Sequence, residues 1–337
     1  MKFGAVPLVE AIGATLAHGI AIGDGRFAKG RILSAEDVSE LGGVGHTTVT
    51  VARLSADDVS ENEAAARIGS KFAAINIEAK SASTGRVNLH ASEAGLLRVN
   101  AKTINAINAI DPSVTVATLP DFTVCQAGAM VATVKIIPFA APLAAVEKAE
   151  TLAAKNALTL HAFKPLQVGL IQTTLPLTKD TVLQKTTEVT RTRITALGGT
   201  LGVAAHCSHN ADDLAQTLHS MLGFDMLIIF GASAVCDEED VIPQAIRLFG
   251  GKITRVGMPV DPGNLMVLGN RGKTIIIGAP GCARSPKENG FDWVLARLFA
   301  GLKVTSRDII GMGVGGLLME IPTRPSPRSS PNEYSND

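Results

Sequence analysis

The chain has 337 residues, enough for two ordinary domains, of which 46% are hydrophobic and 18% charged. This balance allows a sizeable apolar core and argues against general disorder. The 31 basic and 31 acidic residues cancel, so neither bulk nucleic acid nor an anionic membrane surface is an expected partner. Aromatic residues make up only 4%, which argues against a surface that stacks nucleic-acid bases.

The four cysteines lie far apart and form no Cys-x-x-Cys pair. The sequence therefore predicts neither a structural zinc site nor a disulfide scaffold, and reduced thiols fit the cytoplasm. No charged segment followed by an apolar one marks the N-terminus as a secretory signal. The most apolar stretch, about residues 127–146, contains Lys135 and two prolines, which favours buried strand and loop over a membrane span. We expect a soluble, cytoplasmic protein.

The first part of the chain is predicted to be an α+β domain, residues 1–164. Short β-type runs broken by glycine occur at 46–52, 95–100 and 130–137. Helical patterns occupy 60–74 and 101–110, and a stretch rich in Ala, Leu, Glu and Lys at 142–160 predicts a helical connector.

From residue 165 to residue 303, predicted strands and helices alternate. The strands are placed at 167–171, 202–205, 225–230 and around Ile253 and Ile275; the helices at 181–197, 210–221, 241–249 and 286–300. This alternation predicts a three-layer α/β domain, with a parallel sheet covered on both faces and a ligand at the carboxyl ends of its strands. An extension at 304–324 and a Pro- and Ser-rich tail at 325–337 come after it, and the tail is predicted to be disordered.

Two loops that follow strands in this domain have unusual compositions. The first begins with small residues whose amides a ligand can approach closely: Gly231, Ala232, Ser233 and Ala234. Four consecutive acids, 237–240, follow it and precede a helix. Two interpretations of these acids stay open. They complement the helix dipole, or Asp237 and Asp240 bind Mg²⁺ together with phosphate oxygens of a ligand.

The second loop, 278–290, contains Gly281 and Arg284, a flexible approach and a bidentate anion donor. Ser285 is predicted to cap the next helix, with Pro286 at its first position and Glu288 at its third, which makes a capping box. A phosphate site is one interpretation of this pattern. A capped helix with a surface arginine is the other.

The run 167–302 resembles the molybdopterin-binding domain shared by bacterial molybdopterin molybdotransferases and gephyrin. That family carries a Gly-Gly-x-Ser-x-Gly-(Asp/Glu) loop, a Pro-Gly-Lys-Pro turn and a Leu-Pro-Gly-Asn-Pro-x-Ser loop in this order. The counterparts here are residues 231–237, 262–265 and 279–285. The chain is still more similar to a bacterial subgroup of molybdopterin-binding proteins, which carry Gly-Met-Pro-Val-Asp-Pro-Gly-Asn and Gly-Ala-Pro-Gly-Cys-Ala-Arg-Ser-Pro-Lys-Glu-Asn-Gly.

The resemblance implies molybdopterin binding in molybdenum cofactor biosynthesis, with Mg²⁺ and molybdate as further ligands. If the chain is an enzyme, the resemblance implies a transferase that inserts molybdate into molybdopterin or its adenylylated form. Asp237 and Asp240 would be the catalytic and metal-binding pair. A homodimer and other cofactor-assembly proteins are the implied partners. The implied pterin contacts are Gly231, Ala232, Ser233, Ala234, Pro262, Gly263, Asn264, Pro280, Gly281, Arg284 and Ser285.

The chain also departs from that family. Where molybdotransferases have Thr-Gly-Asp-Glu-Leu after the first strand, residues 173–177 read Thr-Thr-Leu-Pro-Leu and offer no carboxylate. Asn264 replaces the lysine of the Pro-Gly-Lys-Pro turn. Pterin binding therefore carries over better than metal insertion. Two alternatives stay open: a non-catalytic carrier or sensor of the finished cofactor, and a nucleotide pyrophosphatase on the same fold.

Overall fold

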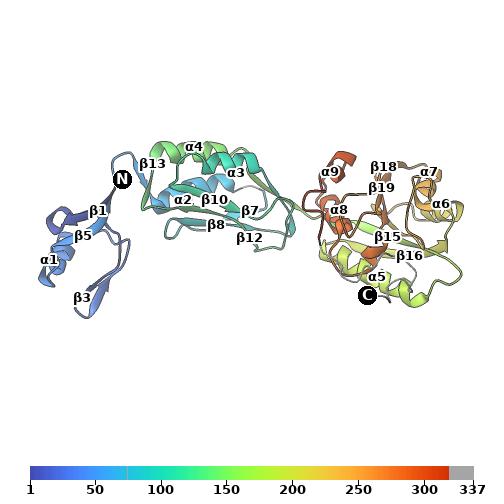
Figure 1. The fold of residues 1–337 in the computed structure, drawn as a ribbon, viewed down its shortest axis with the longest axis horizontal. Helices are drawn as coiled ribbons and strands as arrows, with labels where there is room; N and C mark the ends of the chain where they lie inside the picture. The colour runs from blue at the N-terminus through green and yellow to red at the C-terminus, as the bar shows by residue number, and fades with distance from the viewer. Residues whose placement is uncertain (74, 319–337) are drawn as a thin grey trace, which may run out of the picture. The chain divides into compact units, whose positions relative to one another are not determined.

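The computed structural model describes residues 1–73 and 75–318, which fall into two compact units divided between Ala162 and Phe163 (Figure 1). The predicted tail and the end of the predicted extension lie outside the described residues. Within the described part, no helix is long and apolar enough to cross a membrane.

The first unit opens with a small β module that has its own apolar core. Strand β1 (Lys2–Pro7) pairs antiparallel with β5 (Thr48–Arg53), which also pairs with β2 (Thr15–Leu16). Strands β3 (Ile20–Ile22) and β4 (Gly25–Phe27) form a hairpin, and helix α1 (Ala35–Gly43) begins at a capping box. The buried side chains of this module form a cluster of their own, which includes Leu16, Leu33, Leu41 and Val51.

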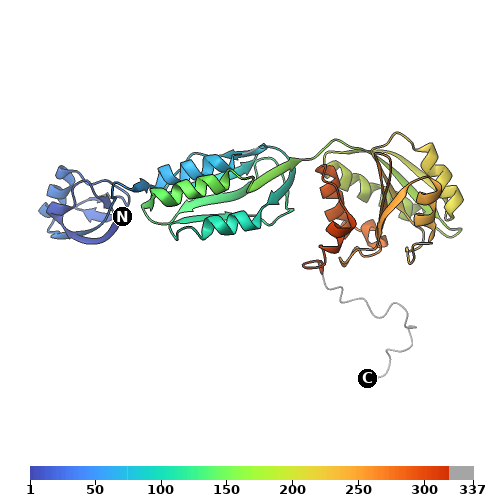
Figure 2. The ribbon, with the colours of Figure 1, turned by 90° about the horizontal axis from the view of Figure 1, so that it is seen from above.

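The rest of the first unit is a layer of helices on antiparallel strands. A four-stranded sheet has the order β10 (Val114–Thr118), β12 (Met130–Ile136), β8 (Arg86–Ala91), β7 (Ile77–Ala79). A second has the order β11 (Val124–Cys125), β9 (Gly95–Val99), β14 (Leu158–Ala162), and β6 (Asp58–Ser60) pairs with β13 (Ala140–Pro142). The helices are α2 (Glu61–Phe72), α3 (Ala101–Asn108) and α4 (Leu143–Ala153), and Figure 2 shows α2 and α4 side by side.

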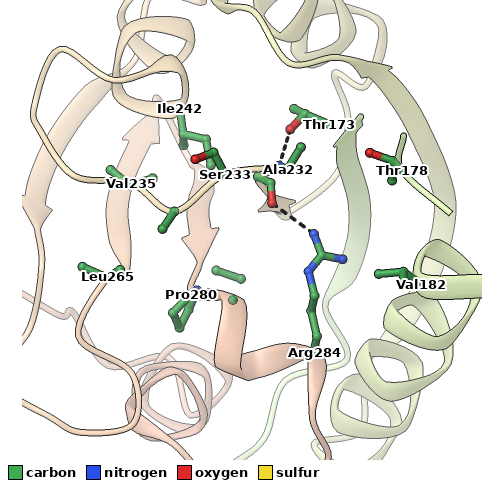
Figure 3. A pocket seen from close by; sticks show the side chains of 14 residues that line it. Thr173, Thr178, Val182, Ala232, Ser233, Val235, Ile242, Leu265, Pro280 and Arg284 are labelled. Carbon is green, nitrogen blue, oxygen red and sulfur yellow. Dashed lines mark hydrogen bonds between the residues drawn. The ribbon is translucent and has the colours of Figure 1, made fainter. Parts of the chain in front are cut away.

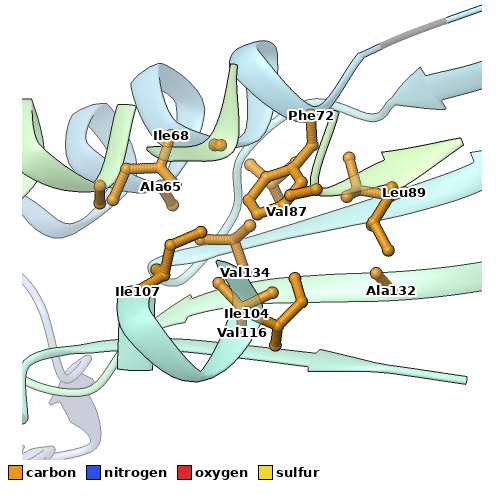
Figure 4. Packing of buried hydrophobic residues seen from close by; sticks show 14 of the residues in the cluster. Ala65, Ile68, Phe72, Val87, Leu89, Ile104, Ile107, Val116, Ala132 and Val134 are labelled. Carbon is orange, nitrogen blue, oxygen red and sulfur yellow. The ribbon is translucent and has the colours of Figure 1, made fainter. Parts of the chain in front are cut away.

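Close packing between α2 and the sheet explains one glycine of this unit. A Cβ added to Gly69 of α2 would lie 2.6 Å from Cγ1 of Val87 on β8. Helix and sheet therefore approach closely enough to bury Ile68, Phe72 and Val134 in one apolar cluster (Figure 4). This is the α+β arrangement that the glycine-broken β runs predict.

The second unit is built on a six-stranded sheet, and the predicted α/β class is confirmed. Its order is β16 (Thr200–Ser208), β15 (Gln167–Thr174), β17 (Met226–Phe230), β20 (Thr274–Ala279), β19 (Val267–Arg271), β18 (Lys252–Val256). The first four strands are parallel. Helices α5 (Asp180–Ala196), α6 (Ala211–Ser220), α7 (Val241–Leu248), α8 (Gly290–Phe299) and α9 (Ser306–Ile310) accompany them.

One edge of this sheet differs from the wholly parallel prediction. Strand β19, which the sequence pattern did not indicate, runs antiparallel to both β18 and β20. Only Gly272 and Lys273 separate β19 from β20. A link of two residues can form a hairpin but not the long crossover that parallel strands need, so β19 must reverse direction.

The helices cover the two faces of the sheet, as expected of a three-layer domain (Figures 1 and 2). Helices α6 and α7 pack on Ile171, Ile229 and Ile276. On the other face, Phe291 of α8 lies edge-on to Phe230, with ring centroids 6.5 Å apart. Alternation along the strands produces this division, since Ile229 and Phe230 point to opposite faces.

The strand order reverses at β15. The chain passes from β15 through α5 to β16 on one side, then through α6 to β17 on the other side of β15. In open α/β sheets, such a reversal leaves a crevice at the carboxyl ends of the two flanking strands, where ligands bind. The topology therefore predicts a ligand site at the carboxyl ends of β15 and β17.

The predicted start of the helix at 286–300 is wrong. Helix α8 begins at Gly290, and its capping box joins Asn289 and Asp292 rather than Ser285 and Glu288. Ser285 instead ends a short 3₁₀ helix, η2 (Gly281–Arg284). The guanidinium of Arg193 on α5 donates to the carbonyls of Ala283, Ser285 and Lys287. A helix beginning at residue 286 would need the carbonyls of 285 and 287 for its own hydrogen bonds.

We expect Asn289→Ala to lower the free energy of unfolding of the second unit by about 1–2 kcal/mol, because Asn289 is buried and caps α8. Trp293 lies in α8 and is the only tryptophan of the chain, so its fluorescence in a urea titration reports on this unit. The exposed cap Asn210 of α6 provides the control. An Asn210→Ala loss as large as that of Asn289→Ala would contradict the role given to burial.

Candidate functional site

A cavity of about 220 Å³ lies at the carboxyl ends of β15, β17 and β20 (Figure 3). The register aligns Gln172 with Phe230 and Phe230 with Ala279, so β17 and β20 end at one level and β15 continues two residues further. Typical small-molecule pockets measure roughly 300–1,000 Å³, so this cavity fits one end of a ligand or a small anion. It is lined by Thr173, Thr178, Val182, Gly231, Ala232, Ser233, Ala234, Val235, Ile242, Leu265, Ala279, Pro280, Gly281 and Arg284.

Arg284 alone carries a charge among these lining residues. Its Nη1 donates to the side-chain oxygen of Gln172 at 3.2 Å and to the hydroxyl of Thr186 at 2.7 Å, and its Nη2 donates to the carbonyl of Gly231 at 3.1 Å. The guanidinium also lies 4.9 Å from the ring centroid of Phe230. Figure 3 shows it reaching into the middle of the cavity.

The charge of Arg284 has no counter-ion within the described part of the chain. All three of its hydrogen-bond acceptors are neutral, and none of the ion pairs of the described residues includes it. Burial lowers the pKa of its guanidinium, because removal from water disfavours the charged form. A half-buried cation without a counter-ion is unfavourable, and an anion that enters the cavity would supply one.

The loop after β17 is fixed to β15 by a short hydrogen-bond chain. The N–H of Ala232 donates to the hydroxyl of Thr173 at 2.8 Å, and this hydroxyl lies 2.8 Å from Nδ1 of His209. Because the hydroxyl accepts from Ala232, its own hydrogen is available to Nδ1 of His209 in the tautomer that leaves this nitrogen as an acceptor. These hydrogen bonds occupy the N–H of Ala232 and hold the loop at the cavity wall.

Other amides of the two loops stay open to a ligand. Within the described residues, the N–H groups of Ser233, Ala234 and Gly281 donate to no protein acceptor. Backbone amides of this kind, beside a guanidinium, are the usual donors to a phosphate or another oxyanion. The cavity therefore has both the charge and the donors of an anion site.

The structure brings most of the predicted loop residues together. Gly231, Ala232, Ser233 and Ala234 line one wall, and Pro280, Gly281 and Arg284 line another. Ser285 does not line the cavity, since its carbonyl accepts from Arg193.

The predicted turn residues Pro262, Gly263 and Asn264 also lie outside the cavity lining. The carbonyl of Pro262 accepts from the N–H of Gly290, and a Cβ on Gly263 would lie 2.7 Å from that same nitrogen. Their contacts place the turn against the start of α8, and the neighbouring Leu265 lines the cavity.

Asp237 and Asp240 bind backbone amides of their own loop. The carboxylate of Asp240 accepts from the N–H groups of Val241 at 2.7 Å and Cys236 at 3.0 Å, and so caps α7. Asp237 accepts from Glu239 at 2.8 Å. Neither acid lines the cavity, and the described residues contain no group of three or more His, Cys, Asp or Glu arranged to hold a metal ion. The structure shows that Asp240 caps α7, and the metal-binding role of Asp237 and Asp240 stays a prediction.

The sequence pattern did not reveal the residues that orient the site from β15 and α5, namely Gln172, Thr173 and Thr186. All three are almost fully buried. A signal was present, since a buried strand that ends in Gln-Thr-Thr carries polar groups that need partners. Which partners they meet depends on the packing of α5 and of the loop after β20, which no local pattern encodes.

The chain is similar to one protein family and to solved structures. The family described as Domain of unknown function (DUF8806) matches residues 5–53, within the first unit. No curated protein matches. Among solved structures, the chain is similar to the molybdopterin biosynthesis moeA protein from Pyrococcus horikoshii OT3, with 10% identity over 92% of this chain and 75% of that chain. The TM-score is 0.28, too low for this similarity to support a function.

Two glycine substitutions separate a ligand-contact role from a structural role. A Cβ on Gly281 would meet nothing within 4 Å, whereas one on Gly231 would lie 2.6 Å from the carbonyl of Ser233. We expect Gly281→Ala to keep the wild-type stability within about 0.5 kcal/mol and to lower sulfate affinity about tenfold, because the methyl group occupies the approach to the amide. Gly231→Ala should lower the free energy of unfolding by about 1–3 kcal/mol, because its methyl group has no space.

Thermal unfolding and calorimetric titration with sulfate measure both effects. Gly4→Ala, at an open position of the first unit, is the control. Unchanged sulfate affinity in Gly281→Ala would remove Gly281 from the site.

Proposed function

We propose that the second unit binds molybdopterin and serves the biosynthesis of molybdenum cofactor. The observation that carries the proposal is the uncompensated guanidinium of Arg284, beside open amides at the reversal of strand order. Molybdopterin is a phosphorylated pterin dithiolene, and its phosphate group supplies the missing negative charge. Arg284 has an Nε–H and a second Nη2–H left over from its bonds within the described structure, which suits bidentate binding of an oxyanion.

The size and lining of the cavity support binding of the phosphate end rather than the whole ligand. The walls are formed by aliphatic and small residues such as Val182, Val235, Ile242 and Leu265, without an aromatic ring among the described lining residues. A pterin ring would not stack inside a cavity of about 220 Å³. We infer that the phosphate enters and that the ring system stays at the rim.

The resemblance of the loops to the molybdopterin-binding family makes the ligand more specific than an unnamed phosphate ester. All three matching segments contribute to this cavity, and 231–237 and 279–285 contribute several residues each. The third, 262–265, packs against the start of α8 and contributes Leu265.

Binding and handing on of the cofactor fits the site better than insertion of the metal. Among the described residues, no carboxylate lines the cavity, and both oxygens of Asp240 already accept backbone N–H groups. Mg²⁺ usually binds one or two carboxylates together with phosphate oxygens. The residues present thus fit an anion better than a metal ion. A carrier or sensor of the cofactor is our preferred form of the proposal.

An anaerobic calorimetric titration with molybdopterin tests the proposal. We expect binding at micromolar concentration or tighter, and a loss of at least about tenfold in Arg284→Met, because a charged pair of hydrogen bonds is removed. Arg191→Met, at an exposed arginine of α5, is the matched control. Failure of wild-type protein to bind molybdopterin, adenylylated molybdopterin or the finished cofactor would overturn the proposal. Binding of ADP-ribose instead would favour the pyrophosphatase alternative.

The double variant Asp237→Asn with Asp240→Asn tests the acids directly. Asparagine caps helices about as well as aspartate does, but its single oxygen can keep only one of the two backbone N–H groups that Asp240 accepts. Thermal unfolding of the double variant therefore serves as the control for the fold of the loop. We expect molybdopterin affinity, measured with and without Mg²⁺, to equal that of the wild type. If Mg²⁺ strengthens binding to the wild type and not to the double variant, the metal role predicted for these acids holds and our expectation is wrong.

A further inference from the structure

Gln172 lies behind the cavity and is fully satisfied within the protein. Its side chain is 0% exposed. The amide nitrogen donates to the carbonyl of Leu183 and to the hydroxyl of Thr187, both at 3.0 Å, while the amide oxygen accepts from Arg284. These partners fix the orientation of the amide, because the reverse would direct its N–H₂ group at a guanidinium, which accepts nothing.

Glutamate would be the isosteric alternative at this position. It would keep an oxygen beside Arg284 and add the negative charge that Arg284 lacks. Two other partly buried arginines, Arg193 and Arg67, have such a partner. The Nε of Arg193 lies 2.6 Å from Asp292, and Arg67 lies 2.8 Å from Glu150. Arg284 differs from them in that its side-chain partners, Gln172 and Thr186, position the guanidinium without neutralising it.

We propose that Gln172 is a positioning residue that determines the charge specificity of the site: its amide holds Arg284 in place and leaves the counter-charge to the ligand. This inference rests on the proposed anion site. It follows that the site selects doubly charged oxyanions, such as a phosphate monoester, over neutral groups of the same shape. The unfavourable isolation of Arg284 in the empty protein becomes part of the binding energy when an anion enters.

Three forms of position 172 separate charge from geometry. The wild type has the hydrogen bond to Arg284 and no charge, Gln172→Met has neither, and Gln172→Glu has both. Both variants lose the two bonds that the amide nitrogen donates to Leu183 and Thr187, so the comparison of Met with Glu is the one that isolates the charge. Sulfate serves as the probe, since it keeps its double charge at neutral pH. If charge decides, sulfate affinity falls in the order wild type, Gln172→Met, Gln172→Glu, with a loss of at least about tenfold in the last. If Gln172 acts only by holding Arg284, Gln172→Glu binds sulfate as well as the wild type does, and the proposal is overturned.

Two further variants keep this ranking interpretable. Gln216→Glu adds the same charge at an exposed position of α6 and should leave sulfate affinity unchanged. Gln172→Glu in an Arg284→Met background buries a carboxylate without a counter-ion, so its Tm should lie below that of either single variant. A Tm that does not fall would show that the introduced carboxylate never met Arg284, and would count against the proposal.

The outcomes also distinguish this inference from the proposed function. Sulfate binding with the expected ranking, but no molybdopterin binding, would leave the role of Gln172 standing and remove the cofactor. Molybdopterin binding that is unaffected by Gln172→Glu would leave the cofactor standing and remove the role of Gln172.

Discussion

An isolated charge organises the second unit. Arg284 carries a full positive charge into a half-buried position, and its hydrogen-bond acceptors are an amide, a hydroxyl and a carbonyl, all of them neutral. Those groups stabilise its position through dipoles, which weaken the cost of burial without cancelling it. Each lies on a different element, β15, α5 or the loop after β17, so the guanidinium ties together the three segments that enclose the cavity.

A second arginine makes this placement possible. Arg193 binds Asp292 at the start of α8 and three carbonyls of the segment 283–287. It thereby holds the loop that carries Arg284 between α5 and α8. The two arginines show how one side-chain type acts differently in different surroundings. Arg193 binds a carboxylate and several carbonyls, so its role is to hold these segments together. Arg284 has no carboxylate partner, so its charge is suited to a ligand.

The sequence predicted the class of the second unit and half of the residues that line its cavity. The small residues 231–234 and the pair Gly281 and Arg284 follow buried apolar strands, and strand–helix alternation brings such strand ends together. Local patterns failed where a distant side chain intervened. Ser285 has good capping chemistry, but Arg193, about ninety residues earlier in the chain, takes the carbonyls that a helix there would need.

Strand β19 and the partners of Gln172 were not predicted either, because both depend on contacts between segments that are distant or not yet placed. The run Val267–Arg271 is short, and its direction is set by the two-residue turn that leads into β20. Gln172 reads as an ordinary polar residue at the end of a strand until α5 and the loop after β20 are placed around it. Tertiary contacts of this kind have no counterpart in periodicity or spacing.

The β module at the start of the chain has a consequence for the inheritance of this protein. Its apolar cluster, from Leu8 to Val51, closes within the same stretch that the family match covers, residues 5–53. A segment whose core is complete within its own boundaries can be gained, lost or exchanged as a cassette, because its neighbours need not be rebuilt around it.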